Sequence, residues 1–315
     1  MKLICTFISD NFSILKNYWT MESQKGCGSA FYGTEKVRDF GRGGLVIILD
    51  WETKKIIAKR KILAPRNLCI LNNKLYLPKG NQEVLILSSD LKKRFSKFYN
   101  PHFNSLHWIS KNSNGFLFAS SGIDLVLQTD FKGKTLWEWW AIDHGFNIDP
   151  RGRTRELDKS KNYRSIKFGT LKQTTHLNSV LEMGKTKYFK DTIYCSFFHQ
   201  GQIIAIDKKT GNYKVVMKNL KHPHALRKIK NRIMFCDTEH NRVIFTDNDF
   251  IKFKYYDIPH ANWIQDSSIL TNGNIIVADS NNNRLVEFSL SNKKIVDEFS
   301  FSKEWKIFSC EEIVC

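Results

Sequence analysis

The chain has 315 residues and a formal net charge of +18, with 49 Lys and Arg against 31 Asp and Glu. Its hydrophobic fraction of 42% supplies enough apolar surface for a core, so the composition excludes a disordered chain. No stretch approaches the roughly 20 apolar residues of a membrane helix, and the apolar run at 3–8 ends too early for a secretory core. We therefore expect a cytoplasmic protein without a membrane partner.

The first strongly apolar segments of the chain predict three strands, at residues 29–35, 44–51 and 55–63. They are rich in aliphatic and aromatic residues and are separated by turn-forming residues. A further apolar run at 3–9 precedes them.

From residue 65 onward, a two-residue step recurs at the start of each apolar segment. The steps are Pro65-Arg66, Pro101-His102, Thr175-His176, Pro223-His224 and Pro259-His260. Each step opens a unit in which four short strands rich in Val, Ile, Phe and Tyr alternate with Gly, Asn, Asp and Ser. A unit of about forty residues with four strands is typical of a propeller blade.

These five units need a sixth to close a ring. The N-terminal region supplies three strands and lacks an inner one, and residues 308–314 have the right length for it, with Cys310 at the position of the step histidines. The alternative is that residues 3–9 take this place. We predict an all-β, six-bladed propeller forming a single domain over residues 1–315, closed by pairing of the C-terminal strand with the N-terminal blade, which leaves no exposed sheet edge.

A basic insertion at about 144–173 separates two of the blades and is too long for an ordinary connection. It contains Arg151, Arg153 and Arg155, and guanidinium groups pair well with carboxylate, sulfate or phosphate. Loops between blades share a face with the starts of the inner strands, so we expect the insertion to meet the step histidines there. The alternative is a solvated surface loop.

The repeated step predicts that His102, His176, His224 and His260 converge on the axis, with Arg66 and Cys310 completing the ring. Two residues further on, a second set points to the same side of each strand: Asn104, Asn178 and Asn262. These asparagines either bind substrate or tie one blade to the next through backbone hydrogen bonds.

Two chemistries fit such a ring. The four histidines could ligate a divalent metal, Zn or Fe, with Glu311, Glu312 or Asp266 as carboxylate assistants. Alternatively, one imidazole could act as nucleophile or general base while Arg66 and the insertion arginines stabilise negative charge. The candidate catalytic residues are Arg66, Glu312 and Arg153, and the candidate substrate-binding residues are Asn104, Asn178, Asn262, Arg151 and Arg155.

Two blades resemble the NHL repeat, through Gly273, Asn274, Ala278, Asp279, Asn283 and Arg284 in one and Asp237, Asn241 and Arg242 in the other. Another blade is similar to those of arylsulfotransferase-like propellers, through Asp130, Gly133, Lys134, Trp137, Glu138 and Trp139. The first resemblance implies metal-dependent lyases, other enzymes or RNA- and protein-binding modules. The second implies a metal-free histidine that carries a sulfuryl group.

The sequence therefore favours a metal-dependent lyase, hydrolase or oxidoreductase that acts on a small anionic or peptide-like substrate. A metal-free histidine group transfer is one alternative, and a scaffold that binds protein or RNA through its basic face is another. No nucleotide cofactor is expected, because the sequence contains neither a Walker loop nor a dinucleotide-binding glycine fingerprint. The oligomeric state is left open.

Overall fold

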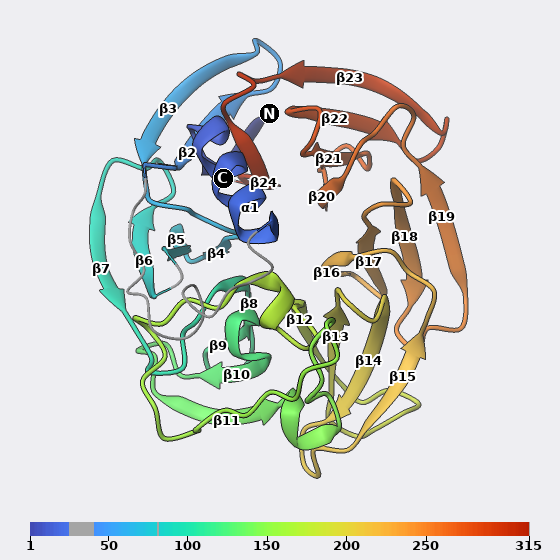
Figure 1. Ribbon diagram of the computed structural model, residues 1–315. Helices are drawn as coiled ribbons and strands as arrows, with labels where there is room; N and C mark the ends of the chain where they lie inside the picture. The colour runs from blue at the N-terminus through green and yellow to red at the C-terminus, as the bar shows by residue number, and fades with distance from the viewer. Residues whose placement is uncertain (25–40, 81, 315) are drawn as a thin grey trace.

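The computed structural model describes residues 1–24, 41–80 and 82–314. Within these residues, six four-stranded antiparallel sheets stand around a central axis, each with one edge strand innermost (Figure 1). The predicted all-β, six-bladed propeller is thus confirmed. The strand predicted at 29–35 lies outside the described residues.

Within each blade, the strands follow one another from the axis outward. The N-terminal blade has β24 (Lys306–Glu312), β1 (Lys2–Ser9), β2 (Leu45–Asp50) and β3 (Lys55–Lys61). The next two have β4 (Cys69–Leu71), β5 (Lys74–Lys79), β6 (Glu83–Ser88) and β7 (Arg94–Phe98), then β8 (Leu106–Lys111), β9 (Phe116–Ser120), β10 (Leu125–Thr129) and β11 (Thr135–Trp140). The fourth blade has β12 (Leu177–Gly184), β13 (Thr192–Phe197), β14 (Gln202–Asp207) and β15 (Tyr213–Met217). The fifth has β16 (Pro223–Ile229), β17 (Arg232–Asp237), β18 (Arg242–Asp247) and β19 (Phe253–Asp257). The sixth has β20 (Ile264–Ile269), β21 (Ile275–Asp279), β22 (Arg284–Ser289) and β23 (Lys294–Ser300).

Burial explains why the strands differ in sequence. The middle strands are covered on both faces by neighbouring blades, so a strand such as β21 is apolar and buried over almost its whole length. The outer strands have one face in water, and β23 accordingly alternates between exposed and half-buried residues. The core therefore consists of apolar layers between adjacent blades.

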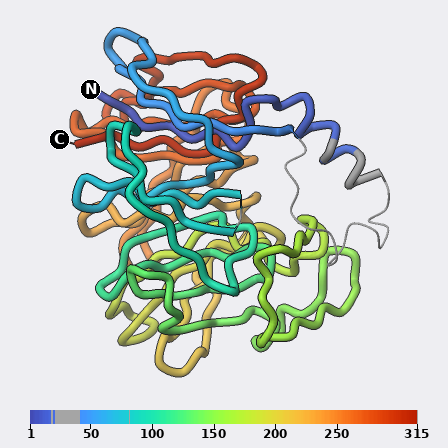
Figure 2. Tube along the Cα trace, turned by 90° about the vertical axis from the view of Figure 1, so that its left-hand side faces the viewer, coloured from blue at the N-terminus to red at the C-terminus, as the bar shows by residue number. Residues whose placement is uncertain are grey.

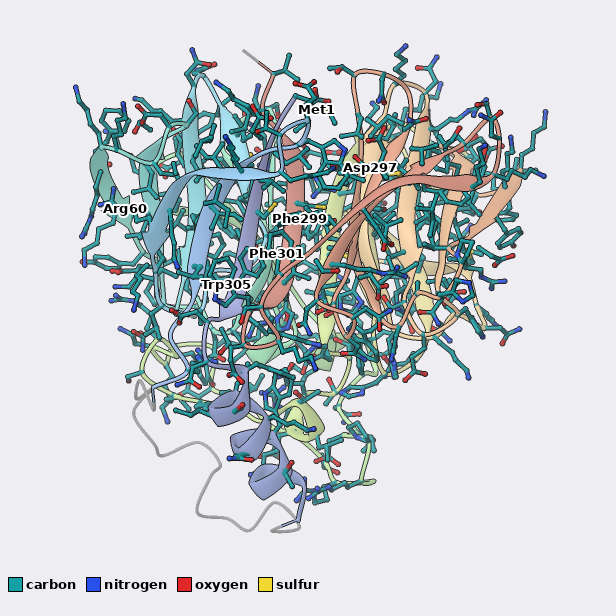
Figure 3. The ribbon with its side chains drawn as sticks, turned by 90° about the horizontal axis from the view of Figure 1, so that it is seen from above. Met1, Arg60, Asp297, Phe299, Phe301 and Trp305 are labelled. Atoms are coloured by element: carbon teal, nitrogen blue, oxygen red, sulfur yellow. The ribbon has the colours of Figure 1, made fainter. Side chains whose placement is uncertain are left out.

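The ring is closed by the C-terminal strand, as predicted. β24 is the innermost strand of the N-terminal blade and pairs with β1, placing Cys310 opposite Cys5. The alternative placement of residues 3–9 was wrong, because β1 takes the second position of that blade. On β1, Phe7 packs edge-on against Phe301 and Trp305, at ring-centroid distances of 4.9 Å and 5.4 Å, where the chain leaves β23 for β24 (Figure 3).

One face of the ring carries the non-strand elements. Helix α1 (Phe12–Gln24) and the connection from β11 to β12 both project from this face (Figure 2). Glu304 holds the start of α1, because its carboxylate accepts hydrogen bonds from the backbone N–H and the hydroxyl of Ser13. Short 3₁₀ turns are η2 (Ser121–Ile123), η3 (Ala141–His144) and η4 (Thr170–Lys172). None of the described helices combines the length and apolar character needed to span a membrane.

Ring closure can be tested at Leu3, whose side chain is fully buried in the layer between the N-terminal blade and its C-terminal neighbour. Leu3→Ala should lower the free energy of unfolding by about 2–5 kcal/mol, since it leaves a cavity in a packed layer. Ile57→Ala is the control, because Ile57 is 50% exposed on β3 and its truncation should change stability by only about 0.5 kcal/mol. Urea denaturation of both variants measures the difference, and equal effects would contradict the assigned seam.

Candidate functional site

A pocket of about 380 Å³ opens where the inner strands begin, and residues of α1 and of the basic insertion also line it. Its volume lies within the range of small-molecule sites. The entrances of the inner strands supply its floor, and residues 166–170 and Gln173 of the insertion form part of its wall. The insertion therefore meets the axis on the predicted face.

Four blades enter the pocket through the same backbone turn. Its first residue has a left-handed backbone, at Ala64 (φ 42°), Ser105 (φ 50°), His222 (φ 54°) and Trp263 (φ 71°). Two positions later, the side chain lines the pocket, giving Arg66, His107, His224 and Gln265. The same ring is completed by His176 from β12's entrance and Phe308 from β24.

His102 and His260 are not part of this ring, which corrects the predicted alignment. In the blades of His102 and His260, the position that lines the pocket comes five residues after the predicted histidine. His107 and Gln265 hold this position. The His102 ring instead contacts Glu138 and the backbone oxygen of Lys159, and His260 is exposed in a turn. Cys310 is also absent from the pocket lining, and Phe308 takes its place.

The His107 imidazole is paired at both nitrogens. Its Nδ1 lies 2.8 Å from the Ser105 carbonyl oxygen, so Nδ1 carries the proton, and Nε2 accepts a hydrogen bond from Arg66 Nη1 at 2.6 Å. The left-handed turn at Ser105 aims this carbonyl at the ring. His107 thus orients the Arg66 guanidinium and has no lone pair left for a metal or a substrate proton.

His176 and His224 have the same tautomer, with Nε2 unprotonated. His224 Nδ1 lies 2.7 Å from the carbonyl oxygen of His222, and His176 Nδ1 lies 2.6 Å from Gln173 Oε1. The Gln173 amide is itself oriented, because its nitrogen donates to the Phe168 oxygen at 3.2 Å. Neither Nε2 has a hydrogen-bond partner among the residues that the structure describes. Both histidines therefore offer a free lone pair at the pocket.

Burial keeps all three imidazoles neutral. It lowers the pKa of His107 and His176 well below the ordinary value of 6.5, with further lowering from nearby Arg66 for His107 and from the neighbouring His107 for His176. It lowers the pKa of His224 to about 3.

Positive charge dominates the pocket. Its lining includes Arg42, Arg66, Lys167 and Lys306, and within residues 1–24, 41–80 and 82–314 no Asp or Glu lines it. Arg66 Nε is buried without a hydrogen-bond partner in this part of the chain, and no carboxylate there forms an ion pair with its guanidinium. Burial accordingly lowers the pKa of Arg66 from its ordinary value. A half-buried guanidinium without an acidic partner favours an incoming anion.

Aromatic rings form a continuous wall beside these charges. The Phe198 ring lies 4.7 Å from that of His176 and 5.9 Å from that of His224, and it stacks on His222 at 3.8 Å. Trp263 lies beyond it, 6.3 Å from His224. This wall keeps the two free imidazoles in a poorly hydrated surrounding.

Asp124 fixes both the insertion and His176. Its buried carboxylate pairs with Arg155 and accepts hydrogen bonds from the backbone N–H groups of Thr174, Thr175 and His176 at 2.7–2.9 Å. Arg155 also donates to the Gly122 oxygen at 2.5 Å and lies 4.7 Å from the Phe168 ring. Arg155, a predicted substrate ligand, is thus occupied in holding the insertion.

Three of the other predicted site residues, Arg151, Arg153 and Glu312, lie outside the pocket lining. Arg151 and Arg153 do not line the pocket, and Arg153 binds Asp149 through two nitrogens at 2.7 Å and 2.9 Å. Glu312 ends β24, about 13 Å along that strand from the pocket-lining Phe308, and accepts hydrogen bonds from Thr271.

The asparagines act largely as ties between segments. Asn104 lines the pocket, but its amide nitrogen donates to the Tyr163 and Ile166 oxygens at 2.6 Å and 2.7 Å. A Cβ atom at position 122 would lie 1.7 Å from Asn104 Oδ1, so the close approach of Gly122 to the Asn104 side chain requires glycine. Asn178 donates to the Pro223 oxygen of the next blade at 3.1 Å. Asn262 does not line the pocket, and its side-chain oxygen accepts a hydrogen bond from Asn281, which does. Asn178 therefore ties one blade to the next through a backbone hydrogen bond, which was the predicted alternative to substrate binding.

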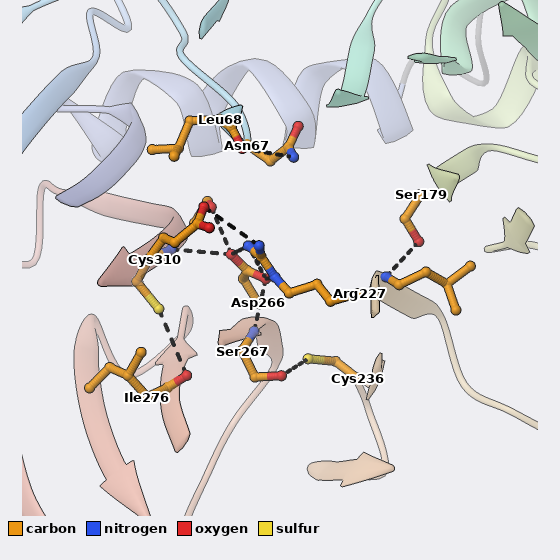
Figure 4. Close-up of polar contacts among 12 residues, drawn as sticks. Asn67, Leu68, Ser179, Arg227, Cys236, Asp266, Ser267, Ile276 and Cys310 are labelled. Atoms are coloured by element: carbon orange, nitrogen blue, oxygen red, sulfur yellow. Dashed lines mark hydrogen bonds and ion pairs between the residues drawn. The ribbon is translucent and has the colours of Figure 1, made fainter. Parts of the chain in front are cut away.

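The residues of the pocket do not fit the expected Zn or Fe site. Nowhere in residues 1–24, 41–80 and 82–314 do three His, Cys, Asp or Glu side chains gather so as to hold a metal ion. The expected carboxylate assistants lie deeper along the axis, where Asp266 accepts from Arg227 at 2.9 Å and Glu311 lies 3.6 Å from Arg227 (Figure 4). Both carboxylates share the single Arg227 guanidinium, and burial raises the pKa of Glu311.

Fold and pocket together define the chain as a six-bladed β-propeller with an axial, cationic, histidine-containing pocket. The chain is similar in structure to streptogramin B lyase (13% identity, 84% of this chain and 79% of that chain, TM-score 0.53) and to virginiamycin B lyase from Staphylococcus aureus (10%, 86% and 85%, 0.51). It is also similar to a structure of a nidogen/laminin complex (11%, 89% and 95%, 0.57). No protein-family model and no curated protein matches the sequence. At these identities the likeness shows the fold alone.

Removal of the Asp124 charge should destabilise the protein strongly. In Asp124→Asn, Arg155 stays buried without its partner, and the expected loss is about 3–5 kcal/mol. Limited proteolysis should then cut within residues 144–173 first. Asp297→Asn is the control, because Asp297 pairs with Lys54 at the surface and its loss should change the free energy of unfolding by no more than about 1 kcal/mol. Similar urea midpoints for the two variants would contradict this role.

Proposed function

We propose that the protein is an enzyme that removes a proton from a small anionic substrate, with His176 or His224 as general base and Arg66 as anion ligand. The observation that carries this proposal is the half-buried Arg66 guanidinium, which has no acidic partner among the described residues and lies in a pocket with two free imidazole lone pairs. A general base needs an accessible lone pair, and it is most effective when its pKa lies near the working pH. An anion bound in the pocket would raise the lowered pKa values of His176 and His224 towards that range, because a nearby negative charge favours the imidazolium form.

The electrostatics of the pocket support this assignment of roles. A carboxylate or phosphate would offset the positive charge of Arg66, and positive charge next to the substrate stabilises the carbanion or enolate that proton removal leaves. His107 holds Arg66 in place through its Nε2 and does not touch the substrate in this scheme. The described residues contain no group of side chains that could ligate the metal of the predicted metal-dependent enzyme.

The likeness to streptogramin B lyase and virginiamycin B lyase adds an analogy of architecture. Those proteins are lyases by name, and a lyase reaction that breaks a C–O or C–N bond by elimination requires a base. Fold likeness does not transfer an activity, so the reaction class rests on the pocket. The NHL resemblance of two blades and the arylsulfotransferase-like resemblance of one blade stay predictions.

Anion binding should depend on Arg66. Titration of the wild-type protein with phosphate, pyruvate and benzoate should raise its melting temperature for at least one of them, since a ligand that binds only the folded state stabilises it. Arg66→Gln should weaken that binding by about tenfold or more, because a charge-assisted hydrogen bond is lost. Arg94→Gln, on the exposed outer strand β7, should bind as the wild type does. Equal loss in both variants would refute the assignment.

The two free imidazoles should react while still neutral at low pH. Diethyl pyrocarbonate acylates neutral imidazole, and an ordinary histidine with a pKa of 6.5 is only about 3% neutral at pH 5. Because their pKa values are lowered, His176 and His224 should be modified at pH 5 almost as fast as at pH 7, and His107 should be spared because Arg66 occupies its Nε2. Peptide mass spectrometry identifies the modified sites.

Protection links the base to the anion site. A bound anion from the titration should slow modification of His176 and His224 in the wild type and have little effect in Arg66→Gln. Reaction rates that fall steeply below pH 6.5, or an absence of protection, would argue against a shared site.

A further inference from the structure

Lys306 is a buried amine in the same pocket. It lies at the entrance of β24, is 6% exposed and lines the cavity. Its Nζ donates to the Ser280 carbonyl oxygen at 3.0 Å and to Asn281 Oδ1, and lies 4.8 Å from the Phe12 ring of α1. Both acceptors are neutral, and no carboxylate of the described residues forms an ion pair with Nζ.

This surrounding favours the uncharged amine. Burial lowers the pKa of Lys306 to about 8, against an opposing effect of the nearby Asp279 charge. A substantial fraction of the side chain is then a neutral amine close to physiological pH, and neutral lysine is a nucleophile towards carbonyl carbon.

Other pocket groups complement this amine. Lys306 and Phe308, two residues apart on β24, line the same pocket as Arg66, and the Arg66 guanidinium lies 5.5 Å from the Phe308 ring. The pocket therefore presents an amine and a guanidinium to a single small ligand. His176 and His224 offer the lone pairs that proton transfers require.

We propose that Lys306 forms an imine with the carbonyl group of a small 2-oxo acid whose carboxylate is bound by Arg66. This inference rests on the proposed function and names its substrate class. The imine acts as an electron sink, so that removal of a proton from the carbon next to it gives a neutral enamine in place of an enolate.

The step is balanced without a further reagent. Lys306 Nζ attacks the carbonyl carbon and forms the C–N bond, and the carbonyl oxygen leaves as water with the two hydrogens that the amine gives up. The imine nitrogen takes one proton from solvent, and the base then removes a proton from the adjacent carbon, which leaves the neutral enamine. The protonated base returns a proton to that carbon and restores the protonated imine. Addition of water to the protonated imine then releases the amine, the carbonyl compound and the proton that was taken from solvent.

Reductive trapping tests the proposal on the full chain. Protein incubated with pyruvate and sodium cyanoborohydride should gain one stable adduct, and peptide mass spectrometry should locate it at Lys306. Lactate, which has the carboxylate but no carbonyl group, should give none.

Three variants define the site. Lys306→Arg keeps the charge and the hydrogen-bond donors but cannot form an imine, so its adduct should be absent. Lys167→Arg changes another lysine of the pocket lining and should be trapped as the wild type is. Arg66→Gln should reduce trapping of pyruvate by about tenfold and leave trapping of neutral acetone unchanged, because only the carboxylate contact is lost.

The outcomes separate this inference from the proposed function. Adducts spread over surface lysines, or an unchanged yield in Lys306→Arg, would overturn the imine. If pyruvate raises the melting temperature through Arg66 but is not trapped, the anion site stands and the imine is wrong. If no anion binds through Arg66, the proposed function fails as well.

Discussion

The Asp124 carboxylate is the contact on which the geometry of the pocket depends. It is fully buried at the end of η2 and neutralises Arg155 of the insertion while accepting backbone hydrogen bonds from the entrance of β12. One group thus fixes a wall of the pocket and the backbone of His176 together. The carboxylate accepts five hydrogen bonds from four residues in two segments. Neither segment can therefore move without exposing the other's buried charge or amides.

The chemistry of the pocket follows from what the fold places at its entrance turns. A left-handed residue turns its carbonyl oxygen towards the imidazole two positions later at His107 and His224, so the backbone itself selects the tautomer with an unprotonated Nε2. At His107 that lone pair serves Arg66, and at His224 it faces no protein partner among the described residues. The same turn therefore produces a positioning residue in one blade and a candidate base in another.

Much of the architecture was predictable from the sequence, because blade strands have a strong period and the chain ends with an unpaired apolar segment. Arg66, His176 and His224 were placed at the axis correctly. His102 and His260 were misplaced because the Pro-His step resembles the other entrances, yet in those blades the left-handed residue that starts the inner strand comes later, at Ser105 and Trp263. The partners of individual side chains could not be predicted from the sequence either. No residue spacing indicates that Arg155 forms an ion pair with Asp124, which leaves it unavailable to a substrate.

The strand that closes the ring also completes the pocket. β24 brings Lys306 and Phe308 to the axis and pairs with β1, roughly three hundred positions earlier in the chain. Closing so long a loop is slow compared with forming each blade from neighbouring strands. During synthesis, the other five inner strands can form before β24 brings Lys306 to the pocket. Binding competence therefore reports that the whole chain up to β24 has been made and folded, so a truncated or half-folded molecule has no complete site.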